Sequence, residues 1–171
     1  DKCSKVMGLG YPGGPIIDRL ARQGNPEAYT FSKPNLPGYD YSFSGLKTGV
    51  INLVHNLEQK GEEIRIADMC KSFQDVAVGV VVDKAKKAVE EFNVKQVILA
   101  GGVSANSYLR AQMQEVMANK NVNLIIPPLW CCTDNAAMIA KVAEHLYEKK
   151  VFAPLDLGVD PNWSIEDYMK F

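Results

Sequence analysis

Short apolar runs alternate with helical patterns in the second half of this chain, and this order limits the fold more than any other feature. Residues 96–102 (QVILAGG) read as a buried strand, and residues 104–118 read as a helix with Ser104 as its N-cap. Residues 122–128 (VNLIIPP) read as a second buried strand, and residues 133–149 as a second helix. Strand, helix, strand and helix joined by short links predict a parallel βαβ unit, and therefore an α/β fold.

The first half of the chain reads as helical. Residues 10–26 predict a turn and a short helix that ends near a glycine, and residues 25–39 predict a proline-rich surface loop. Residues 42–61 have a helical apolar face and end in glycine. Residues 64–92 contain the β-branched run 76–82 (VAVGVVV), which is typical of a strand. We predict a helix there because the helical spacing continues on both sides without turn residues.

The carboxyl-terminal end of the chain carries two further expectations. The last helix should begin with a cap near Thr133 and bury Met138, Val142 and Leu146 on its inner face. Residues 150–171 have no periodicity, and we expect them to pack as irregular chain.

Composition excludes several classes of protein. The 171 residues are 47% hydrophobic, which is enough for one core or two small lobes. Lys and Arg number 19 against 20 Asp and Glu, so no general attraction to nucleic acid or to anionic membrane is expected. No 18-residue apolar run and no signal peptide is present. The four cysteines lack C-x-x-C spacing, so we expect reduced thiols in a cytoplasmic protein. Because the chain opens without Met, we also expect it to be a fragment.

Two glycine-rich turns are candidate ligand sites. Gly101 and Gly102 follow the first predicted strand, where bare backbone can approach a ligand, and Asn106 follows them. The spacing is not G-x-G-x-x-G, so a nucleotide or sugar site and a purely structural turn both remain open. In the segment YPGGPIID, Asp18 lies one helical turn after Gly14. Its carboxylate could reach ribose hydroxyls, or it could simply favour the start of a helix.

A third candidate site lies at Asp134, after the second predicted strand. A carboxylate at the carboxyl edge of a parallel sheet can bind a cation, although a helix cap explains the same residue. His55 and His145 are isolated on helices and form no H-E-x-x-H motif, so a self-contained zinc protease site is absent from the sequence. Neither histidine shares a local motif with a nucleophile.

Five motifs in fixed order give the chain a family resemblance. They are GLGYPGGP, SFSGLKT, SFQ, AGGVSANSYLR and CTDNAAMIA, and they fall within residues 8–140. Over roughly residues 1–147 the chain resembles the carboxyl-terminal lobe of the TsaD family, the tRNA threonylcarbamoyladenosine biosynthesis proteins formerly called O-sialoglycoprotein endopeptidases or glycoproteases.

The resemblance implies a fold and an activity. The fold would be one lobe of an actin-like (Hsp70-like) ATPase fold, a sheet with flanking helices plus a helical insertion. Residues 1–92 would form its helical part with a nucleotide-contacting turn, and residues 93–171 its βαβα core and tail. The activity would be transfer of threonylcarbamoyl from threonylcarbamoyl-AMP to the exocyclic amine of adenosine 37 in ANN-decoding tRNA, with release of AMP.

Matching the family's motifs residue by residue implies a set of adenylate contacts. Asp1, Gly14, Asp18 and Asn106 occupy the positions that hold the adenylate. Gly101 and Gly102 would let the end of the strand approach the nucleotide, while no catalytic residue is assigned.

The resemblance also implies a single divalent metal, iron or zinc, with Asp134 as one ligand. The family's two histidine ligands stand in an H-x-x-x-H motif of the amino-terminal lobe, and this chain has no such pair. Metal sites of this kind usually use at least three protein ligands. We therefore expect the chain alone to bind metal poorly and to be inactive.

Implied partners are tRNA, threonylcarbamoyl-AMP or another adenine nucleotide, and a paralogous subunit and a small ATPase of the bacterial modification complex, with no membrane. Two other functions compete with the transferase. One is a metalloendopeptidase that cleaves glycoproteins, which the absent H-E-x-x-H motif and signal peptide oppose. The other is a non-catalytic scaffold of the same fold, which the presence of Asn106 and Asp134 opposes.

Overall fold

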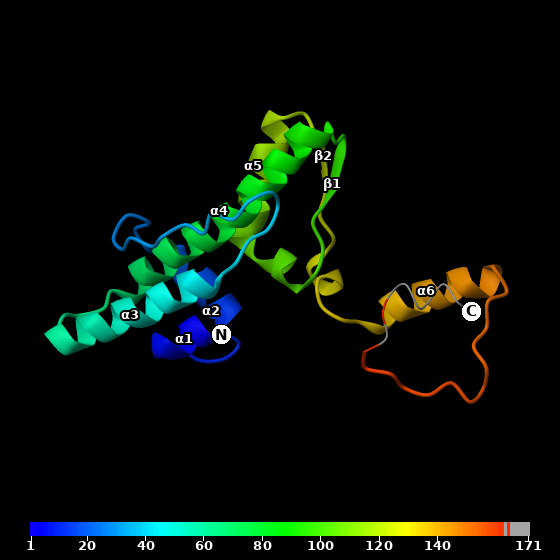
Figure 1. Cartoon of the computed structure of the whole chain (residues 1–171), viewed down its shortest axis with the longest axis horizontal. Coiled ribbons are helices and arrows are strands. Elements are labelled where there is room, and N and C mark those ends of the chain that lie inside the picture. Colours follow the sequence, from blue (N-terminus) through cyan, green and yellow to red (C-terminus); the bar gives the residue numbers. More distant parts are fainter. Residues whose placement is uncertain (163, 165–171) are drawn as a thin grey trace. The chain divides into compact units, whose positions relative to one another are not determined.

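The computed structural model describes residues 1–162 and residue 164 (Figure 1). The chain divides into two compact units, Asp1–Cys132 and Thr133–Phe171, each described by itself below. The first unit contains, in order, α1 (Lys2–Val6), α2 (Gly13–Ala21), α3 (Ser44–Lys60), α4 (Ile66–Phe92), β1 (Gln96–Ile98), the 3₁₀ turn η1 (Gly102–Ala105), α5 (Ser107–Asn119), β2 (Asn123–Ile125) and the 3₁₀ turn η2 (Leu129–Cys131). The second unit contains α6 (Ala136–Glu148). The boundary expected between residues 92 and 93 falls inside the first unit, between α4 and β1.

Strands β1 and β2 are parallel neighbours joined by α5, as the βαβ pattern predicts. Val97 pairs with Leu124, and both are partly buried against the helices. Ile98 on the opposite face is 64% exposed, so the prediction of buried strands is wrong for that face. The reason is physical: helices of the first unit cover only one side of this two-stranded sheet. The paired segments are also shorter than the apolar runs that predicted them.

Helix α4 is continuous through residues 76–82, which confirms the helical prediction for the β-branched run. Its first half packs into a core with α1, α2 and α3 that includes Met69 and Cys70. Its second half packs against α5 and the sheet through Val78, Val82 and Val89. Figure 1 shows α4 (green) running from the group of α1, α2 and α3 to the part of the unit that carries the strands.

Two helix ends in the first unit test the cap predictions. Gly61 ends α3 with φ 69°, in the left-handed region that favours glycine, as predicted. Helix α5 begins instead at Asn106, whose side chain accepts from the amide of Leu109 at 2.8 Å, so the prediction of Ser104 as the cap is wrong. Ser104 lies in η1 and donates its hydroxyl to the carbonyl of Gly101.

Helix α6 differs from its prediction in two ways. Its cap is Asn135 rather than Thr133, and the Asn135 side chain accepts from the amide of Met138 at 3.2 Å. No residue of α6 is buried, and Met138 and Val142 are 43% and 52% exposed. The predicted inner face is therefore unburied, because no other helix or strand is described in this unit to cover it.

The described part of residues 150–171 is irregular chain, as expected, but Leu155 and Val159 are fully exposed, so it is not packed. The rest of the predicted tail, residues 163 and 165–171, lies outside the described residues. Among the helices that the structure describes, none is long and apolar enough to cross a membrane.

The sequence predicted that the short helix within residues 10–26 ends near Gly24. In the structure this glycine has a packing role instead. Helix α2 ends at Ala21, and Pro15 lies in its first turn. A Cβ on Gly24 would stand 2.0 Å from the carbonyl oxygen of Ala67, so only glycine lets the chain pass this close to α4.

Candidate functional site

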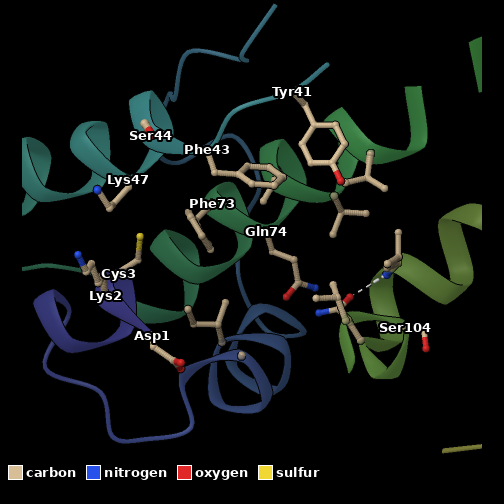
Figure 2. A pocket seen from close by; sticks show the side chains of 18 of the residues that line it. Asp1, Lys2, Cys3, Tyr41, Phe43, Ser44, Lys47, Phe73, Gln74 and Ser104 are labelled. Atoms are coloured by element: carbon tan, nitrogen blue, oxygen red, sulfur yellow. Dashed lines mark hydrogen bonds between the residues drawn. The ribbon is translucent and has the colours of Figure 1, made fainter. Parts of the chain in front are cut away.

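A pocket of about 810 Å³ lies within the first unit, between the amino-terminal helices, α4 and the segment that follows β1 (Figure 2). Three of the predicted adenylate contacts, Asp1, Gly14 and Asn106, line it. These residues are far apart in the sequence, yet the fold brings them to one cavity. Its position at the carboxyl end of β1 is where α/β proteins bind ligands.

Asp1 fixes the glycine turn that forms one wall. Its Oδ1 accepts from the backbone amide of Gly13 at 2.7 Å. A Cβ on Gly13 would stand 2.5 Å from the Cβ of Ser4, so this glycine lets the turn press against α1. A Cβ on Gly14 would meet nothing within 4 Å. Gly13 therefore serves packing, whereas Gly14 leaves open space at the pocket.

Asp18 is placed differently from the other predicted contacts. It is 8% exposed and is not one of the lining residues. Its carboxylate accepts from Gln74 Nε2 at 3.1 Å, from the Ser107 amide at 3.1 Å and from the Ser107 hydroxyl at 3.0 Å. The carboxylate thus ties α2 to α4 and to the start of α5, which is a structural role that the sequence did not indicate.

The two glycines after β1 adjoin the pocket without lining it. Gly101 has φ +88°, where residues with a side chain are strained, and Gly102 opens η1. On this side the lining comes from residues next to them, Ala100, Val103 and Ser104. The glycines shape the turn that places these neighbours.

Asn106 joins this wall to α5. Its Oδ1 is engaged as the helix cap with the Leu109 amide, so the Nδ2 group is the part of the side chain that can donate to a ligand. The cap and the ligand contact therefore use different atoms of one side chain.

Charge and apolar surface are separated within the pocket. Lys2 and Lys47 lie on one side, near Asp1, in Figure 2. Much of the remaining lining is apolar, with Tyr41 and Phe43 at the rim, their ring centroids 5.4 Å apart. Such a cavity suits a flat apolar ring that carries an anionic group.

Cys3 also lines the pocket, and burial raises the pKa of its thiol. A raised pKa keeps the thiol protonated near neutral pH. Cys3 is therefore part of the apolar lining rather than a nucleophile.

Sequence reasoning missed two residues that shape the site. Gln74 lines the pocket and is 5% exposed, and the signal for it was available: it stands on the buried stripe of α4 four residues from both Cys70 and Val78. Arg110 donates from Nε to the carbonyl of Ser104 at 2.5 Å and from Nη2 to the carbonyl of Pro127 at 2.9 Å. It thereby joins the turn after β1 to the chain after β2. No sequence pattern pointed to that contact.

The residues present do not form a metal site. Asp134 belongs to the second unit and is exposed. No group of three or more His, Cys, Asp or Glu side chains converges within residues 1–162 and 164. The described residues therefore do not supply the donor set that a first-row cation needs.

The fold and pocket define the class: an α/β protein with a small-molecule cavity at the carboxyl end of a parallel strand. Residues 1–141 match the family model described as "TsaD: tRNA N6-adenosine threonylcarbamoyltransferase". The chain belongs to this family, which confirms the resemblance seen in the motifs.

Similar curated proteins carry the name tRNA N6-adenosine threonylcarbamoyltransferase. The chain is 50% identical to that of Bacillus cereus (strain ATCC 14579), with 97% of this chain and 49% of the relative covered. It is 46% identical to that of Halalkalibacterium halodurans (98% and 49% covered) and 53% identical to that of Mesoplasma florum (87% and 47% covered). The chain thus spans about half the length of the curated relatives it matches.

Proposed function

We propose that this chain supplies the adenylate-binding wall of a tRNA N6-adenosine threonylcarbamoyltransferase. The completed enzyme would transfer threonylcarbamoyl from threonylcarbamoyl-AMP to adenosine 37 of ANN-decoding tRNA. The observation that supports this most is the convergence of Asp1, Gly14 and Asn106 on one pocket. Membership of the family and the names of the relatives support the same activity.

Each group at the pocket has a use in that reaction. The tRNA amine would attack the carbamoyl carbon, and the bond from that carbon to the phosphate oxygen would break to release AMP. Lys2 and Lys47 would offset negative charge on the phosphate, and the Asn106 Nδ2 group would donate to the nucleoside. The apolar lining would exclude water from the base.

We extend the proposal to the fold. A parallel sheet is normally covered on both faces, yet the Ile98 face of this one is open. The length of the relatives, about twice that of this chain, supports a second lobe that completes an actin-like ATPase fold.

The same proposal assigns Asp134 as one ligand of an iron or zinc ion, with two histidine ligands from outside this chain. Because this chain alone lacks the donor set, we expect it to bind metal poorly and to transfer nothing by itself. The completed enzyme would act on tRNA in the cytoplasm with a paralogous subunit and a small ATPase.

The test joins this chain to the amino-terminal half of a family member and measures threonylcarbamoylated adenosine in tRNA by mass spectrometry. We expect the joined parent to modify tRNA and Asn106→Asp to lower the rate about tenfold or more. This change keeps an oxygen to cap α5 but replaces the Nδ2 donor, so folding is preserved while the ligand contact is lost. Asn56→Asp on the exposed surface of α3 is the matched control.

Two results would oppose the proposal. An inactive joined parent that folds and binds the partner subunits would contradict the transferase. Full activity in Asn106→Asp would remove Asn106 from the binding site.

A further inference from the structure

Among the residues that the structure describes, Gln74 is the pocket-lining residue with a buried side-chain polar atom that has no hydrogen-bond partner. Its Nε2 donates to Asp18 Oδ1 at 3.1 Å, while its Oε1 has no hydrogen-bond partner among the described residues. The residue is 5% exposed and stands among apolar lining residues such as Phe73 and Val78. A buried carbonyl oxygen without a hydrogen-bond partner is destabilising, so a donor that reaches it would be favoured.

The orientation of this carboxamide is fixed by chemistry. An ionised carboxylate only accepts hydrogen bonds, so the Gln74 group that faces Asp18 must be the NH₂. The Ser107 amide donates to Asp18 Oδ2 and the Ser107 hydroxyl to Oδ1, and both bonds hold the carboxylate in place. Gln74 therefore cannot turn its amide over to offer a donor to the pocket. Figure 2 shows its side chain reaching from α4 toward α2.

We propose that Gln74 is a specificity-determining residue whose Oε1 accepts a hydrogen bond from an amino group on the ring of the bound ligand, the 6-amino group of adenine. This inference rests on the proposed function, because it concerns the same pocket. The apolar side chains around Gln74 suit the face of a ring, whereas the lysines lie with Asp1 at another side of the cavity. A ring without the amino group would leave Oε1 unpaired.

The test compares two probes that differ by that one group, AMP and purine riboside 5′-monophosphate. Their affinities for the 171-residue chain are measured by calorimetric titration. We expect the parent chain to prefer AMP by about tenfold, the factor that one unpaired buried acceptor supports. In Gln74→Met, which is similar in length but cannot accept strongly, the preference should fall below about threefold.

Two further variants make the result specific. Gln74→Glu places a carboxyl beside Asp18, where the two share a proton and one oxygen remains as an acceptor, so it should retain the preference for AMP. Gln59→Met on the exposed surface of α3 is the matched control and should leave both affinities unchanged. Circular dichroism checks that each variant is folded.

The outcomes distinguish the role of Gln74 from the adenylate pocket as a whole. An unchanged preference in folded Gln74→Met overturns the role of Gln74 while leaving the adenylate pocket intact. Equal binding of both probes by the parent chain also overturns the role of Gln74, and it would favour a ribose hydroxyl as the donor to Oε1. Failure of both probes to bind the parent chain would overturn the proposed adenylate pocket itself. If Gln74→Met does not fold, Gln74→Leu, which also lacks an acceptor, takes its place, and an unchanged preference in folded Gln74→Leu overturns the role of Gln74.

Discussion

At the scale of single residues, neighbours in the sequence perform different tasks. Gly13 and Gly14 are adjacent in the motif YPGGP, but the first faces Ser4 on α1 and the second faces open space at the pocket. The sequence predicted a ligand role for Gly14, but it did not indicate that Gly13 has a packing role. The difference depends on what lies opposite each Cα, and that is set by long-range packing.

Substituting the two glycines should separate packing from binding. Gly13→Ala should lower the free energy of unfolding by about 1–3 kcal/mol, because its methyl group would overlap Ser4 and the Asp1 backbone. Gly14→Ala should leave stability unchanged or raise it by up to about 1 kcal/mol, since alanine favours a helix. Urea denaturation measures both, and an equal loss in the two variants would contradict the assignment.

At the scale of elements, the helices were predictable and their ends were less so. The prediction of helix α4 was correct despite its β-branched run, because helical apolar spacing over 27 residues outweighs the local preference of that run for a strand. The predicted caps of α5 and α6 each stood two residues before the observed caps, which are Asn106 and Asn135. Each segment holds more than one residue type that can cap, and the choice depends on backbone angles that a sequence pattern does not carry.

The candidate site residues were also predictable only where a local motif marked them. Motifs identified Asp1, Gly14 and Asn106, which line the pocket, as well as Asp18, which instead joins three helices. Gln74 could have been found as a polar residue on a buried stripe, but its partner lies 56 positions away. Contacts of that separation are decided by how α2, α4 and α5 pack.

The tie at Asp18 gives a prediction about these helices. Asp18→Asn should lower the free energy of unfolding by about 1–3 kcal/mol, because an amide offers one acceptor oxygen in place of two and loses the charge-assisted bonds from Ser107 and Gln74. Asp40→Asn, on an exposed loop, is the control. Thermal or urea unfolding measures the change. Unaltered stability with lost AMP binding would contradict the structural role and favour the ribose contact that the sequence suggested.

At the scale of the whole molecule, the first unit combines a parallel strand pair with a pocket at the carboxyl end of β1. The α/β class and the parallel pairing of β1 and β2 were predictable from the alternating pattern. The exposed sheet face at Ile98 was not predictable, because an apolar run indicates burial without indicating which segment packs against it. The chain spans about half the length of the curated relatives it matches.

The most direct test of the account maps AMP onto the chain by amide chemical shifts in NMR. We predict that AMP shifts the amides of Gly14, Ala100 and Asn106, which line one pocket, while those of the surface residues Asn56 and Gln59 on α3 stay unchanged. Binding that leaves the three lining amides unmoved, or no binding at millimolar AMP, would contradict the claim that this pocket holds an adenylate.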